Sequence, residues 1–253
     1  MHPILLKLGP VTLYSYGVTL VVAFLLTTWL AARAARGLPS RALAPGQVVD
    51  VTCWALLGGL LGGRLFYVLL QWDVFRRTPG EILALWRGGL VWYGGFLGGV
   101  LAVWLYARAI RARVLHALDQ LVPFVAFGHA VGRVGCFFNG CCYGLPVSGC
   151  CGVVFAGHST PVVPTQLIES LGLFCLFLFL RRLQQIQHAG HAGRLLGAYL
   201  IGYALLRFLT EFLRGDQAVW WAGLTLQQII SIGVLVAGLS LFIITTRKLR
   251  GSA

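Results

Sequence analysis

The sequence predicts an all-α integral membrane protein with about seven transmembrane helices. Of its 253 residues, 58% are hydrophobic and only 11% are charged, whereas soluble domains carry roughly 25% charged residues. Several stretches also reach the roughly 20 mostly apolar residues that a membrane-spanning helix needs. The links between these stretches are too short for a separate soluble domain. We therefore expect one membrane-embedded domain over residues 1–253.

Seven hydrophobic segments follow one another along the chain. The first follows Lys7 and is too long for the apolar core of a cleavable signal peptide, so we expect it to remain as the first span. The third is short for a span, and the fourth carries His129 and Arg133, which are unusual inside one. The segments are approximately 11–35, 48–71, 91–107, 119–138, 165–180, 195–213 and 224–246.

Basic residues predict the orientation of the helices. A net charge of +13 would suggest nucleic-acid binding in a soluble protein, but no nucleic-acid motif is present. Membrane proteins instead collect Arg and Lys in cytoplasmic loops. The links after the first, third and fifth segments and the C-terminal tail are rich in Arg, whereas 139–164 and 214–223 hold only Arg214. We predict an N-terminus outside and a C-terminus in the cytoplasm, with the basic stretch 72–90 as an interfacial segment.

Two glycine-rich pieces predict close helix packing. They read GGLLGG at 58–63 and GGFLGG at 94–99. Glycines four residues apart lie on one helix face and allow two backbones to approach closely. A phosphate-binding loop would also need a preceding strand, a Lys and a Ser or Thr, which these pieces lack. We expect a helix contact that also leaves room for a lipid.

Charged side chains inside the predicted spans mark the candidate site. Each costs about 2.5–3.5 kcal/mol on insertion scales, so such residues are functional candidates by default. Asp50 and Asp119 lie near predicted cytoplasmic ends, where interfacial capping explains them equally well. Arg207 and Glu211 share a helix face because they are four residues apart, and a purely structural ion pair is the alternative. The other candidates are Arg64, Arg133 and Glu169.

The arginines inside the spans indicate an anionic lipid headgroup. A guanidinium group can donate two parallel hydrogen bonds to a phosphate. Arg64, Arg133 and Arg207 face few acidic residues in the predicted spans. A phospholipid phosphate would balance their charge. Glu169 and Glu211 are the alternative counter-ions, and both interpretations stay open.

A set of short motifs runs in order along nearly the whole chain. The motifs are YSYG at 14–17, GGRLFY at 62–67, GGLVWYGG at 88–95, Asp119, GRVGCFFNGCCYG at 132–144, PTQLIE at 164–169, GYALLRFLTEF at 202–212 and QIIS at 228–231. Their order, spacing and setting in about seven spans resemble the bacterial prolipoprotein diacylglyceryl transferase family, in a cysteine-rich variant.

The resemblance implies an enzyme of lipoprotein maturation in the bacterial plasma (inner) membrane. A diacylglyceryl group would pass from phosphatidylglycerol to the lipobox cysteine thiol of a preprolipoprotein signal peptide, with release of glycerol phosphate. The implied partners are these two substrates and membrane lipids, with no nucleic acid, no cofactor and no metal. The site would face the outer leaflet, where the predicted orientation also places the motif at 132–144.

The chemistry of this transfer suggests roles for the motif residues. Charge grows on the phosphate as the leaving group departs, and preorganised cations stabilise such charge. The expected catalytic residues are Arg133 and Arg207 on the phosphate, Glu211 as a partner of Arg207 or a proton carrier, and Tyr93. The expected substrate-binding residues are Tyr16, Arg64, Arg133, Asn139, Gly144, Glu169 and Tyr203.

Three positions depart from the family pattern. Tyr93 stands where the family usually has a His regarded as the base candidate, and a Tyr with a pKa near 10 is a poor base. Cys136 stands in place of the usual Asn, and Cys141 in place of the usual Glu. In one interpretation the reaction is kept, and the proton leaves to Glu211, Tyr93 or the lipid phosphate. In the other the chain is a catalytically altered relative or a membrane thiol-redox protein.

Five of the seven cysteines gather around the predicted outer Cys-rich loop, 139–164. Disulfides fit an oxidising exterior, free structural thiols are a second interpretation, and a thiolate metal site is a third. Against the third, adjacent Cys pairs lack the two-residue spacer of the usual zinc sites. Cys53 and Cys175 lie in apolar segments and are expected in the core. The clustered cysteines are Cys136, Cys141, Cys142, Cys150 and Cys151.

Overall fold

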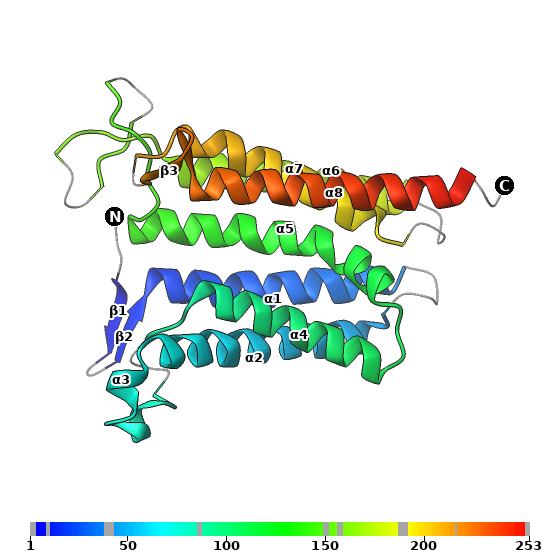
Figure 1. Ribbon diagram of the computed structural model, residues 1–253, viewed down its shortest axis with the longest axis horizontal. Helices are drawn as coiled ribbons and strands as arrows, with labels where there is room; N and C mark the ends of the chain where they lie inside the picture. The colour runs from blue at the N-terminus through cyan, green and yellow to red at the C-terminus, as the bar shows by residue number, and fades with distance from the viewer. Residues whose placement is uncertain are drawn as a thin grey trace. The chain divides into compact units, whose positions relative to one another are not determined.

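Seven long helices account for most of the computed structural model (Figure 1), which describes residues 4–8, 11–37, 43–84, 88–148, 152–155, 159–186, 192–215 and 217–250. Each of these long helices coincides, within about six residues at either end, with one of the hydrophobic segments. They are α1 (Ser15–Ala35), α2 (Pro45–Leu70), α4 (Trp92–Ala109), α5 (Val114–Asn139), α6 (Thr165–Ile186), α7 (Arg194–Glu211) and α8 (Leu226–Arg250).

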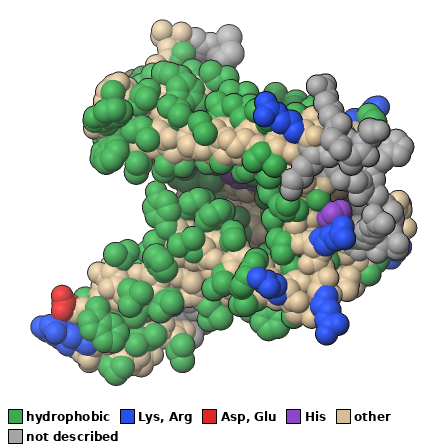
Figure 2. All heavy atoms as spheres, turned by 45° about the vertical axis from the view of Figure 1, so that its right-hand side comes forward, with side chains coloured by type: hydrophobic (Ala, Val, Ile, Leu, Met, Phe, Trp, Pro, Cys, Tyr) green, Lys and Arg blue, Asp and Glu red, His purple; other side chains and the backbone are tan. Residues whose placement is uncertain are grey.

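Four of these helices, α1, α2, α5 and α8, are long and apolar enough to cross a membrane. Large apolar side chains on several helices are exposed, for example Leu61 at 64% and Leu171 at 65%, and Figure 2 shows hydrophobic side chains over most of the visible helix surfaces. Apolar surface on this scale is unfavourable in water and marks contact with lipid. Helix α7 carries three charged residues in only 18, and the full count of seven spans stays a prediction.

Contacts within the chain divide it into two compact units. The large unit comprises Met1–Ala31 and Leu118–Ala253, and the small unit comprises Ala32–Ala117. The prediction of a single domain over 1–253 stays a prediction.

Helices α2 and α4 of the small unit pack through their glycines, as the sequence predicts. A Cβ atom added at Gly58 would lie 2.6 Å from both the carbonyl oxygen of Gly98 and the Cβ of Ala102. No side chain larger than hydrogen fits at that distance. The predicted close packing of the two glycine-rich pieces is therefore confirmed.

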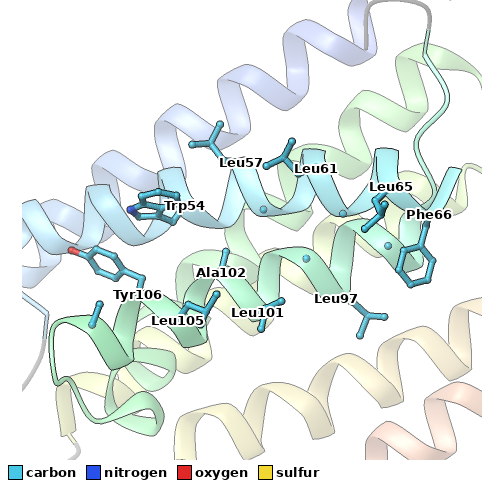
Figure 3. A pocket seen from close by; sticks show the side chains of 15 residues that line it. Trp54, Leu57, Leu61, Leu65, Phe66, Leu97, Leu101, Ala102, Leu105 and Tyr106 are labelled. Atoms are coloured by element: carbon cyan, nitrogen blue, oxygen red, sulfur yellow. The ribbon is translucent and has the colours of Figure 1, made fainter. Parts of the chain in front are cut away.

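Bulkier side chains beside these glycines flank an apolar groove of about 790 Å³ (Figure 3). Its labelled lining includes Leu61 on α2 and Leu101 on α4, with Trp54 and Tyr106 toward one end. The Tyr106 hydroxyl donates a 2.9 Å hydrogen bond to the carboxylate of Asp50. Asp50 thus has a structural partner within the small unit. Because an apolar groove on a membrane helix meets lipid by default, the groove by itself defines no site.

In the large unit, α7 packs against both α6 and α8. Helix α1 contacts α5 closely, since a Cβ atom at Gly128 would lie 2.6 Å from the Oγ1 atom of Thr27. Helix α6 is joined to α5 by a 2.9 Å hydrogen bond from the Ser170 hydroxyl to the Ala130 carbonyl. These contacts fix the rotation of α5, α6 and α7, from which the candidate site is built.

Asp119 caps α7 from a different helix. Its carboxylate accepts hydrogen bonds from the backbone N–H groups of Gly193 at 2.7 Å and Leu196 at 2.8 Å. The first N–H groups of a helix have no partner inside the helix, and a carboxylate there also meets the positive end of the helix dipole. The capping interpretation of Asp119 is thereby confirmed.

Two short hairpins lie outside the sequence prediction. The strands β1 (Ile4–Leu8) and β2 (Val11–Tyr14) pair antiparallel, so α1 begins only at Ser15. The strands β3 (Val219–Trp221) and β4 (Leu224–Thr225) form the second hairpin, directly before α8. Between α2 and α4 lie the short helices α3 (Trp72–Phe75) and η1 (Pro79–Glu81), within the predicted interfacial segment.

The predicted outer loop after α5 is attached to the end of α7. The Leu145 N–H donates to the Leu213 carbonyl at 2.8 Å, and Gly144 and Arg214 form an isolated bridge. The loop and the segment after α7 therefore lie at the same end of the large unit.

Candidate active site

Four charged residues predicted from the sequence meet inside the large unit. Arg133 on α5 lies 2.8 Å from Glu169 on α6, measured from Nε to Oε2. Arg207 on α7 lies 2.8 Å from the other oxygen of Glu169 and 2.9 Å from Glu211, one turn further along α7. Glu169 thus bridges two arginines from different helices. The interpretation in which Glu169 and Glu211 are the counter-ions of the arginines is therefore confirmed, although the bridge through Glu169 was not predicted.

Polar groups beyond the predicted set support this arrangement. The Thr225 hydroxyl donates a 2.8 Å hydrogen bond to Glu211, and the Thr210 hydroxyl donates a 3.2 Å hydrogen bond to Glu169. The Nε atom of Arg214 lies 3.9 Å from Glu211. In the sequence, Arg214 stood out only as a basic residue of an outer link, although its three-residue spacing from Glu211 on a helical turn could have indicated the contact. Nothing in the sequence pointed to Thr225.

The resulting ion network comprises Arg133, Arg207, Arg214, Glu169 and Glu211, which together carry one excess positive charge. Its side chains are buried, with Arg133 the most exposed of them at 13%. The Arg133 Nε atom lies close to Glu169 without the alignment of a hydrogen bond. A guanidinium group has five N–H donors. The network therefore has both the charge and the donors to accept one further anion.

An imidazole lies beside the ion network. His129 precedes Arg133 by one turn of α5, and its ring centroid lies 5.4 Å from that of Tyr203 on α7. His129 also interacts electrostatically with Arg133, Glu169 and Arg207. In the sequence, His129 stood out only as an unusual residue in a predicted span. Its four-residue spacing from Arg133 was the signal that could have placed it at the site.

Three cysteines converge at the end of α5. The sulfur atoms of Cys136, Cys141 and Cys142 lie within 4.8 Å of one another, and these residues are termed the thiol cluster. All three are free thiols and half-buried. Cys150 and Cys151 lie outside the described residues. Cys53 and Cys175 are exposed, so the expectation that they belong to the core is wrong: on helices that face lipid, apolar side chains need no burial inside the protein.

The backbone after α5 turns sharply to bring these thiols together. Gly140 ends the helix with a φ of +73°, a conformation in which glycine is favoured. Cys142 adopts a φ of +63°, which is uncommon for a residue with a side chain. Buried residues at the start of α6 hold the turn, since the Thr165 hydroxyl donates to the Cys142 carbonyl at 2.7 Å and the Gln166 amide to the Cys141 carbonyl at 2.6 Å.

Neighbouring side chains act on the Cys141 thiol inside the thiol cluster. Hydrogen bonds from the side chains of Cys136 and Cys142 hold the pKa of the Cys141 thiol well below its usual range, and Asn139 contributes a further side-chain hydrogen bond. Tyr16, on the first turn of α1, interacts electrostatically with the thiol cluster and with Arg133. The predicted residues Tyr16 and Asn139 are thus placed beside the thiols, next to the ion network.

Gly144 occupies a position that has no space for a side chain. Its N–H donates to the Val163 carbonyl at 2.8 Å. An added Cβ atom would lie 2.5 Å from the Leu213 carbonyl oxygen and 2.9 Å from the Thr165 side chain. The geometry gives Gly144 a structural function in the loop, and its contact with substrate stays a prediction.

Two predicted site residues, Arg64 and Tyr93, belong to the small unit. The Arg64 guanidinium donates hydrogen bonds to the carbonyls of Ile82 at 2.9 Å, Gly88 at 2.6 Å and Glu81 at 2.6 Å. It therefore holds the segment between α2 and α4. Tyr93 is 48% exposed on the first turn of α4. Substrate contacts of both residues stay predictions.

The fold and the site together define a class: a helical multi-pass membrane protein with a buried arginine–carboxylate network beside clustered thiols. The chain belongs to the prolipoprotein diacylglyceryl transferase family, whose family model matches residues 3–244. The resemblance seen in the motifs is thus confirmed.

Named relatives match over nearly their whole length. The phosphatidylglycerol–prolipoprotein diacylglyceryl transferase of Clostridium tetani is 33% identical over 247 residues, which cover 96% of this chain and 97% of the relative. The protein of the same name from Synechococcus elongatus is 34% identical over 249 residues, covering 93% and 84%. That from Bordetella parapertussis is 32% identical over 253 residues, covering 98% and 96%.

Proposed function

We propose that this protein transfers a diacylglyceryl group from phosphatidylglycerol to a prolipoprotein cysteine thiol, the activity that the names of its relatives state. The observation that carries this proposal is the buried ion network, in which Glu169 bridges Arg133 and Arg207. The network has one excess positive charge, and the phosphodiester of phosphatidylglycerol has one negative charge. The membrane thus supplies a substrate that neutralises the site.

The reaction makes a specific electrostatic demand. The acceptor thiolate attacks the glyceryl carbon that bears the phosphate, and the carbon–sulfur bond forms as the carbon–oxygen bond breaks. The electron pair of the broken bond stays on the phosphate oxygen, so a monoanionic diester becomes glycerol phosphate with a second ionisable oxygen. Cations that are already in place stabilise this growing charge, and a single well-placed donor contributes about 3 kcal/mol in comparable sites.

Each member of the network has a function in this proposal. Arg133 and Arg207 hold the phosphate. Glu169 aligns both guanidinium groups, because it contacts one with each of its oxygens. Glu211 is already held by Arg207 and by the Thr225 hydroxyl, which supports a positioning function more than proton transfer. Tyr203 and Tyr16 both interact electrostatically with Arg133, and in this proposal they contact the headgroup or the glyceryl esters.

We also infer the membrane arrangement expected from the sequence: seven spans, an N-terminus outside, a C-terminus in the cytoplasm, and residence in the bacterial inner membrane. Seven long helices support this count. The attachment of the loop after α5 to the end of α7 supports it as well, because alternating spans bring those two ends to one face. The acceptor signal peptide and the lipid then reach the site from the outer side.

The test is a transfer assay with the full chain in phosphatidylglycerol vesicles and a peptide that contains a lipobox cysteine. Mass spectrometry should find a thioether-linked diacylglyceryl peptide. Arg133→Ala should lower the rate about 100-fold or more, as expected for removal of an oxyanion-stabilising donor. The matched control is Arg108→Ala, which removes an exposed arginine of the small unit. Absence of product with the unmodified protein, or equal rates for the two variants, would contradict the proposal.

A further inference from the structure

We propose that the thiol cluster of Cys136, Cys141 and Cys142 binds a thiophilic metal ion, best matched by Zn²⁺, which activates the acceptor thiol. The three sulfurs supply three ligands, and the fourth coordination position takes the thiol of the prolipoprotein cysteine. Only the activation of the acceptor thiol rests on the proposed function. The binding of metal by the cluster stands on geometry alone.

The geometry of the cluster suits a tetrahedral ion. A Zn–S bond of about 2.3 Å places two sulfur ligands about 3.8 Å apart. The three sulfurs already lie within 4.8 Å of one another, so small side-chain rotations close the site. Two ligands on adjacent residues, Cys141 and Cys142, reach the same point because the backbone at Cys142 is left-handed. This conformation removes the objection raised by the missing two-residue spacer.

Side chains at the start of α6 hold the backbone of two of the cysteine ligands in place. The carbonyls of Cys141 and Cys142 accept hydrogen bonds from the side chains of Gln166 and Thr165, two residues that are 0% and 1% exposed. The Cys141 N–H donates to the Cys136 carbonyl at 3.2 Å, which links the turn to α5. Outer contacts of this kind orient ligands and are a general feature of metal sites.

The ligand chemistry selects the type of metal and the type of site. Thiolates favour soft or borderline ions such as Zn²⁺ and Cu⁺ over Mg²⁺ or Ca²⁺. Structural zinc sites are closed by four protein ligands, whereas catalytic zinc sites have three and keep one position for a reactant. The cluster has three sulfurs and is half-buried, so a reactant can approach it. It therefore fits the catalytic type.

A bound metal would activate the acceptor thiol in place of the His base that Tyr93 replaces in this chain. A free cysteine thiol has a pKa of about 8.5, and only its thiolate is an effective nucleophile. A thiol that coordinates a metal ion is deprotonated, and its proton passes to water. The metal-bound thiolate then attacks the glyceryl carbon, the carbon–oxygen bond breaks toward the phosphate held by Arg133 and Arg207, and the thioether product leaves as a weaker ligand. No oxidant or reductant is required.

The competing source of activation is His129, which lies beside Arg133 on the same helix. As a general base, it would accept the thiol proton directly and would need no metal. The two explanations make opposite predictions for chelation and for His129→Gln, so one set of experiments separates them.

The first measurement is metal binding, independent of transfer. The full chain, prepared without a polyhistidine tag and kept reduced, is loaded with Zn²⁺ or Co²⁺, dialysed and analysed by mass spectrometry of the metal. It should retain about one equivalent per chain, and Co²⁺ should show the strong thiolate-to-metal absorption of a sulfur-ligated ion. The triple variant C136S/C141S/C142S should lose both signals. The matched control C53S/C175S removes two exposed cysteines outside the cluster and should keep them.

The second measurement is transfer by the same preparations. Removal of metal with a chelator should lower the rate about 100-fold and added Zn²⁺ should restore it, whereas His129→Gln should reduce it less than about tenfold. Failure of the unmodified protein to retain Zn²⁺ or to show the Co²⁺ absorption overturns the metal site, whether or not the triple variant folds. Full transfer after chelation, with loss in His129→Gln, overturns activation by metal but leaves the proposed function intact. Stable metal binding without transfer under any condition instead overturns the proposed function and leaves the metal site standing.

Discussion

Two buried arginines of this molecule, one in each unit, have opposite surroundings. Arg64 in the small unit donates to backbone carbonyls of Glu81, Ile82 and Gly88. Arg207 in the large unit meets the carboxylates of Glu169 and Glu211. Both are less than 10% exposed, and both looked alike in the sequence. Burial therefore does not distinguish the two arginines, and their different partners are the reason why we propose Arg207 as a site residue.

The partners matter because they decide what the guanidinium group can still do. Neutral carbonyls accept hydrogen bonds from Arg64 and tie it to one backbone segment, so we expect its contribution to be mainly to the fold. Carboxylates from two helices hold Arg207 in a network whose excess charge a substrate can neutralise. Buried ion pairs are weak contributors to stability, so this network is better explained by chemistry than by folding.

Removal of Arg207 should have the largest effect. Arg207→Ala leaves Glu169 and Glu211 with fewer counter-charges, and loss of one partner of a buried ion pair destabilises by about 3–5 kcal/mol. We expect transfer to fall about 1,000-fold and thermal stability to fall with it. The assay is the phosphatidylglycerol transfer rate together with a melting curve in detergent. Arg207→Lys, which retains the charge without the planar fork, should recover part of the stability and less of the rate.

Removal of Arg64 should affect stability more than catalysis. Arg64→Ala leaves at least three carbonyl groups without their donor. These carbonyls belong to half-buried or exposed residues, so each lost hydrogen bond costs about 0.5–1.5 kcal/mol. The melting temperature should fall, while the transfer rate of the folded fraction changes less than about tenfold. If the rate of the folded fraction falls as steeply as in Arg207→Ala, the contrast between the two arginines is wrong and Arg64 contacts the substrate.

Crowding the glycine contact of the small unit should have an intermediate effect. Gly58→Ala places a Cβ atom 2.6 Å from Gly98 and Ala102, and overpacking of this kind costs about 1–3 kcal/mol. Gly46→Ala is the matched control, because nothing lies within 4 Å of its added Cβ atom and alanine is favoured over glycine in a helix. Thermal unfolding should separate the two, with the first variant less stable than the unmodified chain and the second at least as stable. Equal melting curves would show that α2 and α4 do not pack as described.

Loss of the α7 cap should have the smallest effect. Asp119→Ala removes the acceptor of the Gly193 and Leu196 N–H groups, and loss of a capping side chain typically costs about 1 kcal/mol. The transfer rate should stay within about twofold, because the cap lies at the opposite end of α7 from Arg207 and Glu211. A melting curve and the transfer rate of Asp119→Ala test whether Asp119 acts only as a cap. A large loss of rate without a loss of stability would instead assign Asp119 to the site.

Much of the fold was predictable because hydrophobicity is a local property. The seven apolar segments coincide with the seven long helices, and the glycine pieces meet as expected. The first hairpin was missed because β1 and β2 are only five and four residues long and mostly apolar. In the first hydrophobic segment, residues 11–14 therefore looked like the beginning of a span.

The candidate site was predictable in its members and only partly in its contacts. The cost of a charge in a membrane segment marks Arg133, Glu169, Arg207 and Glu211 along the chain. It marks Arg64, Asp50 and Asp119 as well, and only their contacts separate the two sets. Thr225 could not be recognised, because a threonine carries no such cost and its contact with Glu211 depends on the turn before α8.

The sequence by itself determined that this chain is a membrane protein of one family, which side chains are apolar, and which charges lie inside its helices. Only the tertiary structure decided that Glu169 bridges two arginines, that Arg64 donates to backbone carbonyls, and that three cysteines converge at the end of α5. The physical reason is that insertion costs add residue by residue along the chain. Contacts instead depend on helix rotation and on the left-handed turn after α5, which are fixed by packing between segments distant in sequence.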